Sequence, residues 1–248
     1  VFNEASADVD FRVESNGNAN MLFVDGGNDR VGVGVNDPLQ ALEVRGQIGI
    51  SASGTGSKFL GFYSSDTLSS FIEKSGDNLT LYNVDAGDIR LATNDAEKMR
   101  IDSTGAVTMP LQPAFSAVPS AQQSNLTSGT DLLFGVEIFD QNADYNTGNS
   151  TFTAPVTGRY HLGFSIRLQE VPNDAAYVLI TLPTSNRVYY YIYDTGVFDE
   201  QGAYIEFNGD YFADMDANDT AKVSYTQSGG TTSTDFSTSS FFYGYLVC

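Results

Sequence analysis

The 248-residue chain has no tryptophan, one histidine and one cysteine, and these scarcities limit what it can be. Cys248 is the last residue, so neither an intrachain disulfide nor a cysteine-based metal site can be built. Stability must therefore come from packing or from oligomerisation. The single histidine, His161, has no motif such as G-x-S-x-G beside it, which favours a surface or interface histidine over a catalytic one. The chain is accordingly not expected to be an enzyme.

Basic residues are also scarce, with 12 Lys and Arg against 31 Asp and Glu, a formal net charge of −19. Nucleic-acid binding requires basic side chains that neutralise phosphates, so no nucleic-acid partner is expected. No run of about 18 apolar residues occurs, and no membrane insertion is expected. No signal peptide is visible, and Val1 in place of Met suggests a piece trimmed from a longer chain. The acidic residues form a solvated surface or, as the alternative, bind divalent cations such as Ca²⁺.

Phenylalanine, tyrosine and glycine are abundant, with 17, 14 and 24 residues respectively. They occur in short apolar runs separated by Gly, Asn, Ser, Thr and Asp. No long stretch repeats apolar residues at the three- and four-residue spacing of a helix. Short runs between turn residues are typical of sheets. The sequence therefore predicts an all-β protein.

Residues 1–110 contain a loose repeat in which two short strands flank a polar turn. The three copies pair Leu22–Asp25 with Val31–Gly34, Met99–Asp102 with Val107–Met109, and Leu42–Gly46 with Ile48–Ile50. Asp25 and Asp102 are predicted to accept backbone N–H bonds in turns where Gly27 and Gly105 supply permissive backbone. Hairpins this small cannot bury an apolar face alone. We expect three chains to wrap around a common axis as a trimeric stem, with a monomeric sandwich as the alternative.

A proline-rich break separates this stem from the rest of the chain. Pro110, Pro113 and Pro119 fall within ten residues. Proline fixes its own φ and biases the preceding residue towards extended conformations. We place a boundary near residue 111, between a stem at 1–110 and a head at 111–248. An irregular loop inside one domain is the alternative.

The head contains longer and more aromatic strands than the stem. In Tyr160–Ile166 alternate positions are apolar, which indicates one buried face. Eight or more short strands without helices between them predict an antiparallel sandwich or jelly roll. The expected strands are Leu132–Phe139, Thr151–Pro155, Gly158–Leu168, Ala176–Leu182, Arg187–Tyr193, Ala203–Phe212, Ala221–Gln227 and Ser239–Val247.

The segment FRVESNGNANMLFVDGGNDRVGVGVNDPLQALEVRG, residues 11–46, resembles one common in phage tail-fibre and related virion adhesin proteins. Their pattern is close to V-G-I-G-T-x-x-P-x-x-x-L-x-V-x-G, and Val33 and Val35 replace its Ile and Thr. The other matching positions are Pro38, Leu42, Val44 and Gly46. Bacterial surface proteins use similar segments. The resemblance implies a virion fibre.

The head resembles the globular head of complement component one q, of the tumour-necrosis-factor-like jelly-roll superfamily. Three ordered clusters carry the resemblance: Pro113–Ala117 as the first strand; Tyr145, Asn146, Phe152, Pro155, Gly158 and Tyr160 in a Y-N, F-x-x-P-x-x-G-x-Y pattern; and Ser240–Val247 in an S-x-F-x-G-x-L ending. The turn at Ala217–Asp219 departs from the family, which usually has Gly before the Asp. The resemblance implies a jelly-roll fold and trimerisation.

Candidate site residues fall into three sets. Aromatic residues predicted to meet neighbouring subunits are Tyr189, Tyr191, Tyr193, Phe241, Tyr243 and Tyr245. Receptor contact is expected in two polar loops, through Gln169, Asn173, Asp174, Gly229, Thr231 and Thr232. Asp214, Asp216 and Asp219 mimic the start of a calcium loop. Asp219 stands there in place of the required Gly and Tyr225 in place of the required Glu, so a strand-connecting turn is the preferred interpretation.

Together these features predict a homotrimeric adhesive fibre protein of a virion, of the phage tail-fibre type and therefore extracellular. The head is expected to recognise a host surface receptor, a glycan or a protein, with avidity from three sites. The N-terminal end is expected to bind other virion proteins. The alternatives are a purely structural capsid or tail decoration fibre, a bacterial surface adhesin, and a glycan-cleaving tailspike.

Overall fold

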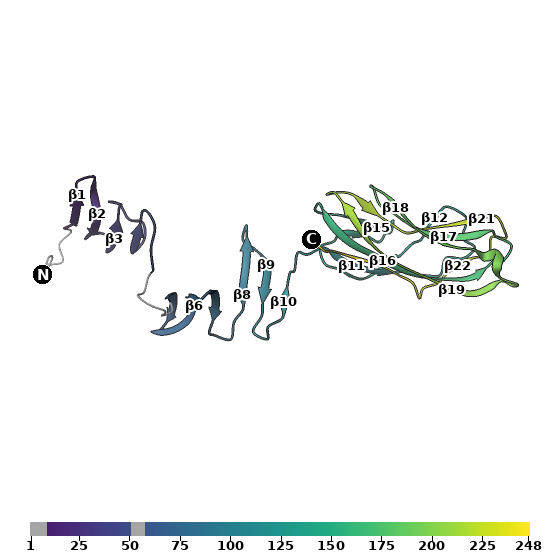
Figure 1. Ribbon diagram of the computed structural model, residues 1–248, viewed down its shortest axis with the longest axis horizontal. Coiled ribbons are helices and arrows are strands. Elements are labelled where there is room, and N and C mark those ends of the chain that lie inside the picture. The colour runs from purple at the N-terminus through teal and green to yellow at the C-terminus, as the bar shows by residue number, and fades with distance from the viewer. Residues whose placement is uncertain (1–8, 51–57) are drawn as a thin grey trace. The chain divides into compact units, whose positions relative to one another are not determined.

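The computed structural model describes residues 9–50 and 58–248, which are built of β-strands joined by turns and loops (Figure 1). The chain forms two compact units, Val1–Ile89 and Arg90–Cys248. The described residues contain one helical element, the 3₁₀ helix η1 at Thr195–Val197. None of their helices has the length and hydrophobicity to cross a bilayer. The predicted all-β class is confirmed.

The first sheet has the strand order β1 (Phe11–Ser15), β2 (Asn18–Asp25), β3 (Arg30–Val33) and β4 (Leu42–Val44). The antiparallel pair β2–β3 confirms the first predicted hairpin. Asp25 Oδ1 accepts hydrogen bonds from the N–H groups of Gly27 and Asn28, at 3.0 and 2.9 Å. The left-handed residue of this turn is Asp29, with a φ of 55°, so the conformational role predicted for Gly27 is wrong.

The hairpin predicted from Leu42–Gly46 and Ile48–Ile50 is wrong. β4 runs parallel to β3, with Leu42 opposite Val31, and residues 48–50 form no strand. The intervening loop is fixed to β3, because Arg30 Nη1 donates to the Pro38 carbonyl at 2.8 Å. Alternating apolar residues identify a strand but not the direction of its partner, which is why the pattern misled.

Two three-stranded antiparallel sheets follow. The first has the order β5 (Lys58–Ser64), β6 (Thr67–Ser75) and β7 (Asn78–Asn83), and the sequence had not predicted it. The second has the order β10 (Val107–Thr108), β9 (Ala96–Ile101) and β8 (Ile89–Thr93), and its β9–β10 pair confirms another predicted hairpin. There Asp102 Oδ1 accepts from the N–H groups of Thr104 and Ala106 at 2.8 and 3.0 Å, and Gly105 has a φ of 91°.

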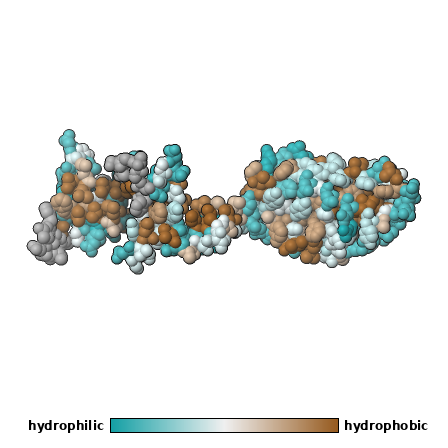
Figure 2. Space-filling view, turned by 60° about the horizontal axis from the view of Figure 1, so that its bottom comes forward, coloured by the Kyte–Doolittle hydropathy of each residue, from teal (hydrophilic) through white to brown (hydrophobic). Residues whose placement is uncertain are grey.

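These small sheets leave apolar side chains exposed. In the β5–β7 sheet the strand register aligns Leu60, Ile72 and Leu81 in one row, and these side chains are 49, 38 and 51% exposed. Hydrophobic residues also gather on the visible surface of the β1–β4 region (Figure 2). A single layer of three strands has no second layer to cover such a row.

The strands β11 to β23 form an antiparallel sandwich. One layer is a six-stranded sheet in the order β13-β11-β23-β16-β19, with β22 paired to β16. The facing layer consists of the sheets β12-β21-β17-β18 and β14-β15-β20. The bounds are β11 (Ala114–Val118), β12 (Thr130–Asp131), β13 (Val136–Asp140), β14 (Tyr145–Asn146), β15 (Thr151–Thr153), β16 (Gly158–Val171), β17 (Tyr177–Pro183), β18 (Val188–Tyr193), β19 (Gly202–Met215), β20 (Thr220–Ala221), β21 (Ser224–Ser228), β22 (Asp235–Phe236) and β23 (Phe241–Leu246).

The core between the layers is aromatic. Alternate side chains of β16 are buried, from Tyr160 to Leu168, as the sequence predicted. The Phe115 ring stacks between Tyr145 and Phe152, with ring centroids 4.9 and 4.8 Å away. This interleaving of rings from distant strands joins the first strand of the head to the facing layer.

Two predicted strands differ from the structure. The strand expected at Leu132–Phe139 begins only at Val136, as β13, because Leu132 and Phe134 turn into the core and the Phe134 N–H donates to the Ser150 hydroxyl at 2.7 Å. The strand expected at Ala221–Gln227 is split into β20 and β21. The other predicted strands are confirmed, and β16 and β19 reach 14 residues each.

Side chains of one head loop hold the segment that leads into the head. Gln141 Nε2 donates to the carbonyls of Met109 and Gln112 at 2.8 and 2.6 Å, and Asn142 Nδ2 donates to the Leu111 carbonyl at 2.8 Å. Residues 109–112 are therefore fixed to the head. The functional boundary near residue 111 stays a prediction.

Candidate functional site

The outer face of the six-stranded sheet carries exposed aromatic side chains. The strand register sets His161 of β16 between Phe212 of β19 and Tyr245 of β23. These positions alternate with the buried residues of β16, so they point away from the core. Phe212, Tyr245 and Phe241 are 69, 46 and 40% exposed. We call His161, Phe212, Phe241, Tyr243 and Tyr245 the aromatic face.

A polar cluster lies in the middle of the aromatic face. His161 Nε2 lies 3.3 Å from Asp210 Oδ1, and the Tyr243 hydroxyl donates to the same oxygen at 2.8 Å. Burial, with the hydrogen bond and charge of Asp210, raises the pKa of Tyr243 to about 12. Gly163 makes room for this ring, because a Cβ there would lie 2.6 Å from it. His161 thus belongs to a sheet face, as expected for a surface or interface histidine.

The predicted interface residues Tyr189, Tyr191 and Tyr193 lie elsewhere, on β18 at the edge of the facing layer. They pack against β19 of the same chain. Tyr189 stacks on Tyr211 with ring centroids 4.7 Å apart, and Tyr191 meets the Phe207 ring edge-on at 5.7 Å. The two predicted interface sets therefore occupy different surfaces, and their contact with another subunit stays a prediction.

The structure brings the two predicted receptor loops together. The Asp174 carboxylate accepts hydrogen bonds from the Thr231 N–H and hydroxyl at 2.9 and 2.8 Å, and these bonds hold its pKa below the ordinary value. Gly229 and Gly230 are both left-handed. A Cβ on Gly230 would lie 2.6 Å from the Ala175 nitrogen, so the close approach of the loops requires glycine.

A third segment, missed by sequence reasoning, joins these loops. Gln201 Nε2 donates to the Glu170 carbonyl and to the Ser233 hydroxyl oxygen, at 2.8 and 3.0 Å. No local pattern marks Gln201, because its partners are distant in sequence. Of the other predicted contact residues, Gln169 lies within β16, Asn173 is half-buried and Thr232 is exposed. Receptor contact by this loop cluster stays a prediction.

Two of the three candidate cation ligands, Asp214 and Asp219, are engaged by protein groups. Arg187 donates to both carboxylate oxygens of Asp214, at 2.9 and 2.8 Å. Asp219 Oδ2 accepts from the Asp216 N–H and from Asn186 Nδ2, each at 2.9 Å. Within the described part of the chain, no three or more His, Cys, Asp or Glu side chains gather to hold a metal ion. These acids build a strand-connecting turn.

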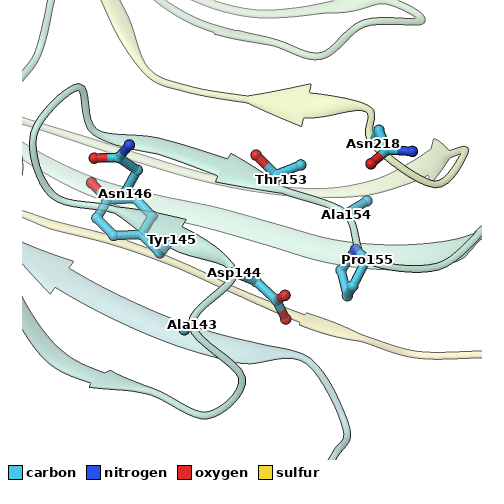
Figure 3. Close-up of a pocket in the computed structure, with 8 residues that line it drawn as sticks. All are labelled: Ala143, Asp144, Tyr145, Asn146, Thr153, Ala154, Pro155 and Asn218. Atoms are coloured by element: carbon cyan, nitrogen blue, oxygen red, sulfur yellow. The ribbon is translucent and has the colours of Figure 1, made fainter.

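A polar pocket of about 400 Å³, which the sequence did not predict, lies between β14, β15 and the turn before β20 (Figure 3). Its lining residues are Ala143, Asp144, Tyr145, Asn146, Thr153, Ala154, Pro155 and Asn218. Backbone bonds fix its walls: the Thr153 N–H donates to the Asp144 carbonyl and the Asn218 N–H to the Ala154 carbonyl, at 2.8 and 2.7 Å. Burial and the charge of Asp140 raise the pKa of Asp144.

Comparison with known proteins identifies the head. The family model of the C1q domain matches residues 114–247, more than half of the chain. The globular domain of a zebrafish complement 1qA protein is 15% identical with a TM-score of 0.44, over 55% of this chain and 98% of that one. Murine APRIL at pH 8.5 is 13% identical with a TM-score of 0.40, over 55% of this chain and 99% of that one. No curated protein matches. On the strength of the family model, the chain belongs to the C1q domain family.

Proposed function

We propose that the chain is a homotrimeric, non-enzymatic adhesive fibre protein of a virion, whose head binds a host surface receptor. The observation that carries this proposal is the aromatic face. Exposed aromatic side chains clustered on one sheet face are typical of a surface that a partner covers. Trimerisation is also what the resemblance to complement component one q implies.

A threefold arrangement pairs two different surfaces of neighbouring subunits, because only a twofold axis pairs a surface with itself. The aromatic face is one of these surfaces. The other is the sandwich edge formed by β18 and β19, where Tyr190 and Ile192 are exposed on the side opposite Tyr189 and Tyr191. We expect the β18 edge of one subunit to cover the aromatic face of the next.

The N-terminal sheets supply independent support for association. The row of Leu60, Ile72 and Leu81 has no second layer within its own sheet. Three copies of this sheet around an axis would bury three such rows against one another. Each fully buried aliphatic side chain contributes about 1.5–3 kcal/mol relative to an exposed one, so the gain from nine side chains would be substantial.

The location on a virion rests on the resemblance of residues 11–46 to phage tail-fibre segments. In this proposal the N-terminal end binds other virion proteins, and the loop cluster around Asp174 and Thr231 contacts a glycan or a protein. The Asp174 loop follows the Val171 end of β16, and the Thr231 loop, which follows β21, is hydrogen-bonded to it there. The chain enters and leaves the head at the other end, where the Arg159 N–H donates to the Cys248 carbonyl at 2.7 Å. Three such clusters on one particle gain avidity.

Light scattering tests the trimer. The expected mass is three times 26.7 kDa. Tyr245→Arg places a charge in the aromatic face and is expected to give a monomer, because an unpaired buried charge is costly. Val197→Arg, at an exposed position of η1, is the matched control and should stay trimeric. A monomeric wild-type protein would overturn the proposal.

A glycan array and an adsorption assay test the receptor site. Thr232→Arg is expected to weaken binding at least tenfold and to reduce the protein's ability to block host adsorption, because it adds bulk to the exposed loop. Thr67→Arg, the same exchange at an exposed position of β6, is the control with the same added charge and should bind normally. A trimer that neither binds nor blocks would instead be a purely structural fibre.

A further inference from the structure

One carboxylate of the pocket is incompletely compensated by the protein around it. Asp144 Oδ2 is buried and has no hydrogen-bond partner. A buried acceptor without a partner costs free energy, and a carboxylate costs more than a neutral group. Native proteins rarely retain such a group unless it serves a ligand, an ion or ordered water.

The neighbouring side chains compensate this carboxylate only in part. Asn142 lowers its pKa, but burial and the charge of Asp140 outweigh that effect, and the Asn142 amide donates to the Leu111 carbonyl at 2.8 Å. Both oxygens of Asp140 already accept backbone bonds, from the Asp144 and Tyr145 N–H groups at 3.1 and 2.9 Å. Asp140 repels the Asp144 charge instead of compensating it. The pocket walls are fixed by the backbone bonds of Thr153 and Asn218, so the side chain has no easy route to another partner.

The remaining polar groups of the pocket suit a ligand rich in hydroxyls. Asn146 Oδ1 accepts from the Gly148 N–H at 2.8 Å, which leaves its amide N–H groups as donors. Within the described part of the chain, the Thr153 hydroxyl and the side-chain amide of Asn218 have no hydrogen-bond partner. The pocket thus presents one charged acceptor, free amide donors and a hydroxyl within about 400 Å³.

The negative charge around the pocket excludes an anion as its ligand, and the small number of carboxylates that face it excludes a calcium ion. An anion would meet the Asp144 carboxylate and a chain of net charge −19. A calcium ion takes six to eight oxygen ligands, usually with several carboxylates. Here a single carboxylate faces the pocket, because Asp140 is already engaged and no acidic cluster forms in the described residues.

We propose that this pocket binds one neutral sugar unit of a surface glycan, with the Asp144 carboxylate accepting a hydrogen bond from a sugar hydroxyl. Asn146, Thr153 and Asn218 bind neighbouring hydroxyls. The inference deepens the proposed function, on which it rests only for the origin of the glycan, and it adds a site distinct from the Asp174–Thr231 loop cluster. The pocket belongs to the sheet β14-β15-β20, which contributes no strand to the aromatic face or to the β18–β19 edge. The proposed trimer contacts therefore do not use this sheet.

The test uses the full chain and four neutral probes: glucose, galactose, mannose and N-acetylglucosamine. Calorimetry and saturation-transfer NMR are expected to show saturable binding of at least one sugar, with one site per chain. Asp144→Asn should weaken that binding at least tenfold, because it removes the charged acceptor. Asp77→Asn, in the β6–β7 turn, is the charge-matched control and should leave binding unchanged.

Two further measurements separate a ligand role from a structural one. Asp144→Asn is expected to raise the melting temperature at pH 7, because it removes an uncompensated charge; a structural carboxylate would lower it. Asn218 has a φ of 76°, which glycine adopts without strain. Asn218→Gly should therefore keep the melting temperature and still weaken sugar binding.

The inference is overturned if none of the four sugars binds, which is the result expected if only water fills the pocket. It is also overturned if Asp144→Asn binds sugar normally, or if calcium binds there in place of sugar. A trimer that adsorbs to its host with an inert pocket would overturn this inference alone. A monomer that binds sugar through Asp144 would overturn the trimer and leave the pocket standing.

Discussion

Individual aspartates of this chain differ in how folding changes the pKa of their carboxyl groups. Asp25, Asp102 and Asp174 accept N–H and O–H hydrogen bonds in turns or loops, and these bonds lower their pKa values. Asp144 is the opposite case, because burial raises its pKa. A carboxyl whose pKa is lowered by folding stabilises the fold while ionised, and one whose pKa is raised destabilises it while ionised.

Acid is expected to weaken the β9–β10 hairpin through Asp102. Its folded pKa is below the unfolded value, so its contribution is complete above about pH 4 and is lost as pH falls through the folded value. Asp102→Asn keeps an oxygen for the Thr104 N–H but cannot titrate near that pH. Thermal melting at pH 7 and pH 3 should show a smaller drop in the variant than in wild type. Equal drops would mean that other acids dominate.

Phe115 is expected to be a critical core residue because it packs between two stacked rings. Phe115→Ala removes both contacts and should lower the free energy of unfolding by about 3–5 kcal/mol. Denaturant unfolding followed by tyrosine fluorescence measures the loss. Val197→Ala, at an exposed position, should change the same quantity by no more than about 0.5 kcal/mol. A loss below about 1 kcal/mol for Phe115→Ala would contradict the stacked core.

Individual strands were predictable where one face is buried and the other is not. β23 alternates in this way over its whole length and β16 and β19 over most of theirs, and the turn at Asp102 has its own local chemistry. The sheet β5–β7 was not predicted, because its strands alternate less regularly and neither face is fully buried. The pocket was not predictable either, since its lining comes from three segments that only the fold brings together.

The loop that holds the segment before β11 yields a prediction at the scale of one connection. Gln141 and Asn142 donate three hydrogen bonds to carbonyls of residues 109–112. Replacing both by alanine should free this segment while the sandwich stays folded, because neither side chain belongs to the core. Limited proteolysis should then cleave near residues 109–112 at least several-fold faster than in wild type. Unchanged cleavage, with an unchanged melting temperature, would show that backbone packing alone fixes the segment.

The whole molecule carries a strong negative charge that opposes association. In the proposed trimer the formal charge is three times −19, or −57. The aromatic face and the apolar rows of the small sheets favour association, whereas the net charge opposes it. The balance depends on ionic strength, since exposed charges interact over about 30 Å at 0.01 M salt and about 10 Å at 0.1 M.

Salt is therefore expected to stabilise the trimer. Light scattering during dilution should show dissociation at a higher protein concentration in 0.01 M NaCl than in 0.3 M NaCl, because screening removes repulsion between subunits while apolar burial persists.

Calcium chloride at equal ionic strength should act no more strongly than NaCl if screening is the whole effect, since the candidate acids Asp214 and Asp219 are already paired with protein groups. A much stronger effect of calcium would show that the trimer creates a cation site from several chains. Dissociation that increases with salt would show instead that ion pairs between subunits, and not the aromatic face, hold the assembly together.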